Sequence, residues 1–315
     1  MTPINPQMRA GEWGLLFALA LIWGFSFFFI GVSVKAIPPF SVVVLRVGFA
    51  ALALLGVMLA SGQGFALTGK AAAVLILLGF LNNAFPFSLI VWGQTHISSG
   101  LASILNAITP MFTLIVAHFL THDEKMTRQR VVGLLVGFAG IVIMIGTDAL
   151  KGLGGHVLGQ LAVCVAAFSY ALGGVSGRRF QGLGLTPLQL SAGTMTAATL
   201  MLVPLVLVVD RPWNLPVPGW HVWGAILGLS LMCTALAYII YFRILATAGA
   251  VNIMLVTFMV PVTAIMLGAV FLDEQLAPKH FAGMGLIGLG LLAIDGRLVD
   301  WLRSRTGTTA SEEAS

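Results

Sequence analysis

Polar side chains that could bind a solute lie inside otherwise apolar stretches of the sequence. One stretch carries four residues at the i, i+3, i+4 and i+7 spacing of a single helix face: Asn106, Thr109, Pro110 and Thr113. An apolar environment cannot satisfy hydrogen-bonding groups, so these side chains must find partners inside the protein or on a bound molecule. They therefore either line a solute cavity or join neighbouring helices to one another.

Similar polar positions recur in other apolar stretches. Asn82 and Asn83 are adjacent in the middle of one stretch, and Thr234 and Tyr238 repeat the four-residue spacing in another. The residues that we expect to line a cavity are Trp23, Ser26, Asn82, Asn83, Asn106, Thr109, Tyr170, Thr234, Tyr238, Asn252 and Thr257. For Trp23, a place in the packed core is the alternative to stacking on a solute.

Two prolines and one arginine add specific chemistry to these stretches. Pro110 and Pro261 remove a backbone donor and open the helical hydrogen-bond ladder, so they are either hinges or static kinks. Arg46 falls about 9 Å inside the expected outer end of its helix, at 1.5 Å per residue. Its guanidinium could contact an anionic group of a solute, extend outward to water, or cap carbonyls of a neighbouring helix.

Acidic residues are absent from the middle of every apolar stretch. All eleven Asp and Glu residues fall at stretch ends, in loops or in the tail. Proton antiport through a central acid is therefore disfavoured, and His118 is the one titratable alternative that we considered. Movement of a neutral or zwitterionic metabolite fits these residues better.

Cofactor and metal chemistry is not predicted. The sequence has no HExxH, GxSxG or phosphate-binding glycine loop, and its two cysteines, Cys164 and Cys233, lie in apolar stretches. We expect no metal, no cofactor, no catalytic residues and no enzyme activity.

The elements that position these residues are membrane spans. Of 315 residues, 58% are apolar and 9% are charged, whereas soluble domains carry about 25% charged residues. This composition excludes a soluble enzyme and a nucleic-acid binder, and it makes membrane lipid a partner. We predict an all-α polytopic membrane protein with ten transmembrane helices, at 14–34, 40–60, 73–92, 101–120, 131–147, 157–176, 188–208, 222–241, 250–271 and 281–295.

The basic residues predict the orientation of the chain. With a cytoplasmic N-terminus, inside segments hold eleven Lys and Arg residues and outside loops hold four. We therefore expect both termini in the cytoplasm of a cell with a bacterial inner membrane. The predicted organisation is a cytoplasmic N-terminus (1–13), a first five-helix repeat (14–147), a periplasmic linker (148–156), a second repeat (157–295) and a cytoplasmic tail (296–315).

The two halves resemble each other in the order of their features. Pro39 corresponds to Pro187, and Pro110 corresponds to Pro261. Acidic turns follow both later prolines, as THDEKMT and LDEQLA. Five helices per half is an odd number, so the second half enters the membrane from the opposite side. This predicts an inverted 5+5 repeat, which is typical of alternating-access transport.

These features resemble an EamA-type transporter of the drug/metabolite transporter superfamily. The resemblance covers about residues 14–295 and includes ALIWGFSFFFIGVSVKAIPPFSVVVLR, SSGLASILNAITPMFTLIVAHFL and AYIIYFRILATAGAVNIMLVTFMVPVTAIMLGAVFLDEQL. It implies ten helices, a central cavity, and export or exchange of amino acids and other small metabolites. The family's Leu-Gly-Glu turn reads Thr121-His122-Asp123-Glu124 here, which departs from the pattern by one residue.

Glycines and rival functions leave alternatives open. Two stretches carry glycines that allow close helix contact, either within the fold or in a homodimer. They are Gly133, Gly137 and Gly140 on one stretch, and Gly283, Gly288 and Gly290 on another.

A drug or other small-molecule efflux carrier of the same fold is one alternative function. A non-transporting scaffold or receptor is another, and it would explain neither the repeat nor the polar faces.

Overall fold

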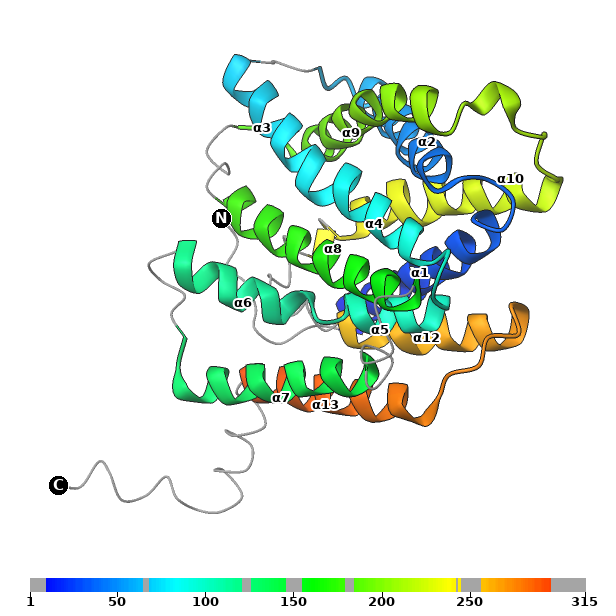
Figure 1. Ribbon diagram of the computed structural model, residues 1–315. Helices are drawn as coiled ribbons and strands as arrows, with labels where there is room; N and C mark the ends of the chain where they lie inside the picture. Colours follow the sequence, from blue (N-terminus) through cyan, green and yellow to red (C-terminus); the bar gives the residue numbers. More distant parts are fainter. Residues whose placement is uncertain are drawn as a thin grey trace.

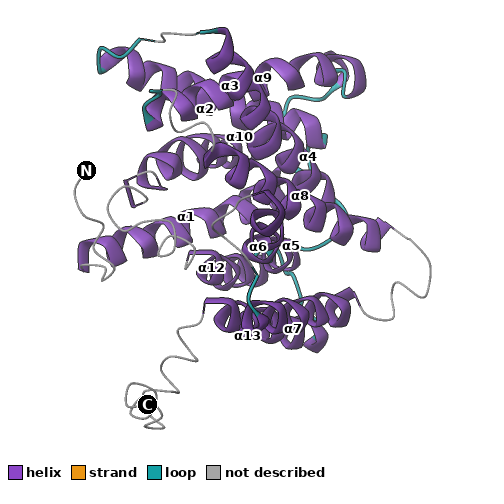
Figure 2. Cartoon of the chain, turned by 90° about the vertical axis from the view of Figure 1, so that its left-hand side faces the viewer, coloured by secondary structure: helices purple, strands orange, loops and turns teal. Residues whose placement is uncertain are grey.

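The protein is a helical bundle in the part of the chain that the structure describes. The computed structural model describes residues 10–64, 68–120, 126–145, 155–178, 184–241, 243–244 and 256–295, and within these ranges it contains helices and no strands (Figures 1 and 2). Seven of its helices are long and apolar enough to cross a membrane. The chain is therefore a multi-pass membrane protein, as predicted.

The helices follow the expected stretches to within a few residues. Four long helices are uninterrupted: α1 (Ala10–Ser33), α2 (Pro39–Ala60), α8 (Gly155–Arg178) and α9 (Pro187–Val209). Three shorter ones are α7 (Arg128–Ile145), α12 (Val256–Phe271) and α13 (Pro278–Asp295). Within the described residues, these three correspond to the fifth, ninth and tenth predicted spans and are not among the seven. Residues 146–147 of the fifth span and 250–255 of the ninth lie outside the described part. A short 3-10 turn, η4 (Pro212–Asn214), follows α9.

Three further spans are divided along their length. The third consists of α3 (Gly69–Gly79), the π-helical segment η1 (Phe80–Ala84) and α4 (Phe85–Gly93). The fourth consists of α5 (Ser99–Asn106) and α6 (Thr109–Leu120), with a break at 107–108. The eighth begins with α10 (Trp220–Leu227) and continues through the π-helical segment η5 (Gly228–Leu236) to Tyr241. Since π-helical turns are rare and often mark functional sites, these interruptions are notable.

Hydroxyl groups satisfy carbonyls that the π-helical segments leave open. Ser169 on α8 donates to the carbonyl oxygen of Leu81 in η1 at 2.8 Å. In η5, Thr234 donates to the carbonyl of Leu229 at 2.8 Å, and Ser230 donates to that of Ile226 at 2.7 Å. The interruptions are thus stabilised by side chains of this chain.

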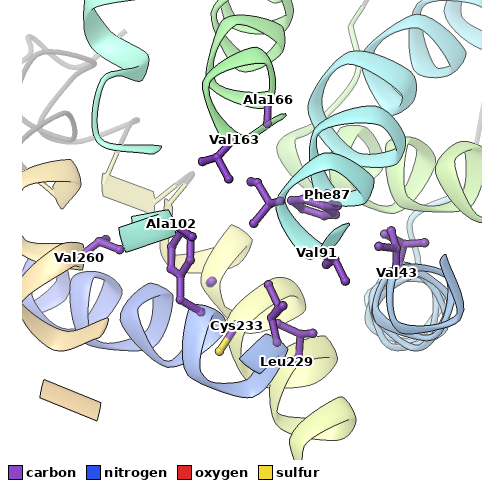
Figure 3. Close-up of a cluster of buried hydrophobic side chains, with 14 of the residues drawn as sticks. Val43, Phe87, Val91, Ala102, Val163, Ala166, Leu229, Cys233 and Val260 are labelled. Carbon is purple, nitrogen blue, oxygen red and sulfur yellow. The ribbon is translucent and has the colours of Figure 1, made fainter. Parts of the chain in front are cut away.

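The helices lie side by side and run roughly across the view in Figure 1. Helices α2, α3 and α9 form one edge of the bundle, α7 and α13 form the opposite edge, and α1, α4, α8 and α10 lie between them (Figures 1 and 2). The central helices bury an apolar core to which α2, α4, α5, α8, α12 and η5 contribute, including Val43, Phe87, Val163, Leu229 and Val260 (Figure 3).

Helices α7 and α13 form a close pair through their glycines. A methyl group at Gly290 would lie 2.5 Å from the carbonyl oxygen of Gly133, and one at Gly140 would lie 2.6 Å from that of Gly283. The backbones therefore touch where only hydrogen side chains fit. Of the two alternatives for these glycines, contact within the fold is the one the structure contains.

Helices α2 and α9 run antiparallel, and each is capped from the end of the other. Asp210, just after α9, accepts hydrogen bonds from the backbone nitrogen of Ser41 at 2.6 Å and from its hydroxyl at 2.7 Å. At the other end, Thr186 donates to Gln63 at 2.9 Å, and Gln189 donates to the carbonyl of Gly64 at 2.6 Å. These bonds satisfy polar groups at both helix starts and fix the two helices in register.

A third cap crosses between distant segments. Glu274, in the turn between α12 and α13, accepts hydrogen bonds from Ser99 N at 2.8 Å, Ser99 Oγ at 2.7 Å and Gly100 N at 3.2 Å. A carboxylate at a helix N-terminus is favoured by the helix dipole and by the open backbone donors there. The start of α5 is thereby attached to the α12–α13 turn.

Candidate functional site

Arg46 is a buried cation in the middle of the bundle. It is about a third of the way along α2 and is 5% exposed. Its Nε donates to the hydroxyl of Thr234 at 3.0 Å, and its guanidinium carbon lies 3.6 Å from the ring centroid of Phe87. Among the described residues, no carboxylate pairs with the guanidinium.

Two of the chain's three tyrosines, Tyr170 and Tyr238, lie near this cation, and Tyr241 packs next to Tyr238. Tyr170 on α8 meets the ring of Phe87 edge to face, with centroids 6.4 Å apart. Tyr238 and Tyr241, one helical turn beyond η5, have centroids 6.5 Å apart. Tyr170 and Tyr238 are both near enough to Arg46 to interact with its charge. The cation is therefore surrounded by phenol groups and rings.

Contacts extend from the tyrosines to α1 and η1. The hydroxyl of Tyr238 donates to Oδ1 of Asn83 at 3.1 Å. Tyr241 packs on Trp23, with ring centroids 5.9 Å apart. We call this set the central polar cluster: Trp23, Arg46, Asn83, Phe87, Tyr170, Thr234, Tyr238 and Tyr241. The first, second, third, sixth and eighth spans contribute to it, and both π-helical segments do so directly, through Asn83 and Thr234.

Two amide groups near the centre have unused hydrogen-bonding atoms. Asn83 is fully buried, and its Nδ2 has no partner among the described residues. Oδ1 of Asn106, at the end of α5, is also buried without a partner there. Leaving such a group unpaired costs about 1–3 kcal/mol. Orphaned polar groups of this kind are expected where a ligand or water completes the bonding.

The side chains of the central polar cluster offer charge, hydrogen-bonding groups and aromatic surface for recognition. The guanidinium can recognise a carboxylate or similar anionic group, while the rings of Trp23 and Phe87 can contact apolar atoms. Within the described part of the chain, no group of three His, Cys, Asp or Glu side chains is placed to hold a metal ion. Recognition by charge, hydrogen bonds and ring contacts is what this set of side chains offers.

Some of the predicted site residues lie together in the structure, and others lie elsewhere or outside the described residues. Six of them belong to the central polar cluster: Trp23, Arg46, Asn83, Tyr170, Thr234 and Tyr238. Ser26 is buried on α1. Asn82 turns away from Asn83 and packs on the backbone of Gly173 in α8. Asn252 lies outside the described residues, and so does the side chain of Thr257.

The fourth span uses its polar groups locally. Thr109 donates to the carbonyl of Asn106 at 2.7 Å, across the break at 107–108, and Thr113 donates to the carbonyl of Thr109 at 2.9 Å. Pro110 is the second residue of α6, directly after that break, whereas Pro261 lies inside a continuous α12. The two hinge candidates thus differ in setting, and a helix interruption accompanies Pro110.

Phe87 is the main cluster residue that the sequence did not reveal. Its position four residues after Asn83 places both on one helix face, and that spacing was the available signal. A phenylalanine in an apolar stretch is usually a core residue, so the contact with Arg46 becomes visible in three dimensions alone. Tyr241 continues the Thr234 and Tyr238 spacing by three residues.

These features define a multi-pass helical membrane protein with a buried arginine inside the bundle. The chain belongs to the EamA-like transporter family, whose model matches it twice, over residues 12–146 and 157–294. The resemblance seen in the sequence is therefore confirmed, and the family domain is duplicated.

Named relatives are similar along most of the chain. The uncharacterized transporter YoaV of Bacillus subtilis is 23% identical over 88% of this chain and 94% of its own length. The uncharacterized inner membrane transporter YedA of Escherichia coli is 25% identical over 89% of both chains. A probable amino-acid metabolite efflux pump of Escherichia coli is 25% identical over 88% of this chain and 92% of its own.

A solved crystal structure has the same fold. It matches with a TM-score of 0.63 and 20% sequence identity, over 91% of this chain and 98% of that one. This likeness concerns the arrangement of helices. The relatives' names agree in one respect: each of the three is described as a transporter or an efflux pump.

Proposed function

We propose that this protein is a secondary transporter that moves small carboxylate-bearing metabolites, such as amino acids, across the inner membrane by alternating access, in the direction of export. The observation that carries the proposal is Arg46, a charged guanidinium that is buried well inside a span and has no carboxylate partner in the described structure. A central charge costs about 2.5–3.5 kcal/mol on insertion scales, so an anionic group that neutralises it would bind favourably. Export takes its support from the relative named as an efflux pump.

The proposed architecture has ten transmembrane helices in an inverted 5+5 repeat. Its units are 1–13, a first repeat at 14–147, a linker at 148–156, a second repeat at 157–295 and a tail at 296–315. Supporting it, the helix pairs α2–α9 and α7–α13 each join equivalent spans of the two halves, and α1 packs on α12 as α6 packs on α8. The segments η1 and η5 also fall in equivalent spans.

The proposed topology places both termini in the cytoplasm. In support, α1 begins and α13 ends on the left-hand side in Figure 1. Helices α3 and α7 begin and α8 ends on the same side, and Lys70, Arg128, Arg130 and Arg178 belong to these helix ends. Lys35 and Arg211 follow the opposite ends of α1 and α9, and Lys279 is at the start of α13. This bias agrees with the positive-inside rule.

In the proposed transport cycle, the solute binds at the central polar cluster. Its carboxylate contacts the Nη atoms of Arg46, Nδ2 of Asn83 donates to it, and the rings of Trp23 and Phe87 cover its apolar part. The segments η1 and η5, together with the break before Pro110, are the points at which helices bend as the halves rock about the site. Transport requires no bond chemistry, and we propose none.

The experiment is transport in liposomes containing the purified protein. Vesicles loaded with unlabelled neutral amino acids should take up the labelled ones by exchange, and Arg46→Gln should reduce the initial rate at least about tenfold, the effect of losing roughly 1.4 kcal/mol of binding. Amines of the same skeleton without the carboxylate should not exchange. Equal exchange by Arg46→Gln, or equal exchange of amines, would overturn the proposal.

A further inference from the structure

A polar pocket lies at the end of the third span that is opposite to Lys70. Its volume is about 370 Å³, and its walls come from the end of α1, the turn after α4, the start of α5 and the α12–α13 turn. Gly31, Lys35, Gln94, Ser99 and Glu274 line it. Gln94 is eleven residues beyond Asn83 on the same span, or about 16 Å along a helix, so this pocket is separate from the central polar cluster.

Gln94 provides an unused amide at this pocket. Its side chain is 7% exposed, and neither Oε1 nor Nε2 has a hydrogen-bond partner among the described residues. Burying an amide in this way is unfavourable unless something else completes its bonds. A side chain that lines the pocket thus has one donor group and one acceptor atom without a partner in the described structure.

Opposite charges accompany the amide. Glu274 is fixed by three hydrogen bonds from Ser99 and Gly100, but a carboxylate has about four acceptor positions, so its charge and one position remain. Lys35 is exposed, and within the described structure no carboxylate pairs with its ammonium group. The pocket thus holds a cation and an anion that do not neutralise each other.

We propose that this pocket binds a zwitterion of the α-amino acid class. The carboxylate of the ligand contacts Lys35 and Nε2 of Gln94, and its ammonium group contacts Glu274 and Oε1 of Gln94. The volume suits a small molecule, since ligand pockets span about 300–1,000 Å³. We assign to the pocket the role of a release site on the outer side, for a solute that has left the central polar cluster. This role rests on the proposed function, whereas the binding of a zwitterion by the pocket does not depend on it.

The test is site-directed protection in the purified full-length protein. Thr95, which is exposed and lines the pocket, is changed to cysteine and labelled with a maleimide; the parent protein, whose cysteines are Cys164 and Cys233, is the blank. L-leucine and L-alanine are compared with compounds lacking one charge: 4-methylpentanoate and 3-methylbutylamine, and propionate and ethylamine. Ser61→Cys, which is exposed at the end of α2 and away from the pocket, is the control: slower labelling there would show that the added compound acts on the maleimide itself.

We expect the amino acids to slow labelling of Thr95→Cys about threefold at twice their dissociation constant, and the singly charged compounds to have no effect at the same concentration. Lys35→Gln or Gln94→Leu should remove the protection, whereas Lys35→Arg should keep it. Arg46→Gln should also keep it, so that loss of transport and loss of this pocket are distinguished. Absence of protection by both amino acids, or protection that survives in Lys35→Gln and Gln94→Leu, would overturn the proposal.

Discussion

The guanidinium of Arg46 lies over the face of Phe87, 3.6 Å from the ring centroid, in the middle of the membrane-spanning bundle. A cation over an aromatic face is attracted by the ring quadrupole, and the attraction reaches about 2 kcal/mol when both groups are removed from water. Phe87 thereby holds the guanidinium plane in place, while Thr234 orients its Nε.

Replacing Phe87 should weaken transport if the ring positions the cation. We expect Phe87→Leu to reduce the initial rate of amino-acid exchange in liposomes about tenfold, which corresponds to roughly 1.4 kcal/mol. Phe87→Tyr keeps the ring face and is the matched control. If Phe87→Leu exchanged as fast as the parent protein, the contact would have no part in transport.

The three asparagines should affect transport rather than membrane insertion. Asn83→Ala removes both the acceptor for Tyr238 and the free Nδ2 donor, so we expect the largest loss of transport there. Asn106→Ala should have a smaller effect, and Asn82→Ala smaller still, because Asn82 packs on Gly173. Protein amount in membrane fractions is the control; unchanged kinetics in all three variants would contradict the cavity assignment.

Removing the cap at Glu274 should destabilise the fold. Glu274→Ala leaves Ser99 N, Ser99 Oγ and Gly100 N without their acceptor, and loss of such a cap costs about 0.5–2 kcal/mol. The adjacent Asp273 has a positive φ of 56°, which asparagine tolerates, so Asp273→Asn is the control. Thermal unfolding of the purified variants should show a lower Tm for Glu274→Ala alone.

Two glycines of α13 should respond in opposite ways to the same substitution. In Gly290→Ala the new methyl would lie 2.5 Å from the Gly133 carbonyl, and overpacking of this kind costs about 1–3 kcal/mol. At Gly285 nothing lies within 4 Å of the added methyl. Alanine has the higher helix propensity, so Gly285→Ala should unfold at the same or a higher temperature. Equal effects at both positions would contradict the close α7–α13 contact.

The membrane class, the helices and the family could be predicted from the sequence because composition and hydropathy reflect the lipid environment directly. Most predicted span boundaries differ from the observed ones by four residues or fewer. The glycine pattern of α7 and α13 is compatible with contact within the fold or between two copies, because the same small residues serve both.

The interruptions of the third and eighth spans could not be predicted. Segments η1 and η5 consist of ordinary apolar and polar residues, and their π-helical hydrogen bonds depend on partners elsewhere, such as Ser169 for the carbonyl of Leu81. Adjacent residues of a regular helix point about 100° apart, and a single extra residue in a π-helical turn rotates the following helix face further. In the structure, Asn83 joins Tyr238 and Asn82 packs against α8.

The hydrogen bonds between the ends of α2 and α9 make the two halves of the chain dependent on one another. Cut between 148 and 156, the N-terminal fragment would keep Ser41 without Asp210, and the C-terminal fragment would keep Thr186 and Gln189 without Gln63 and Gly64. Each fragment would then lack the residues that hydrogen-bond to its helix ends, and the other fragment would carry them. We expect the two fragments to associate when they are made in the same cell. A fragment made alone would expose to the lipid the surface that normally packs on the other half.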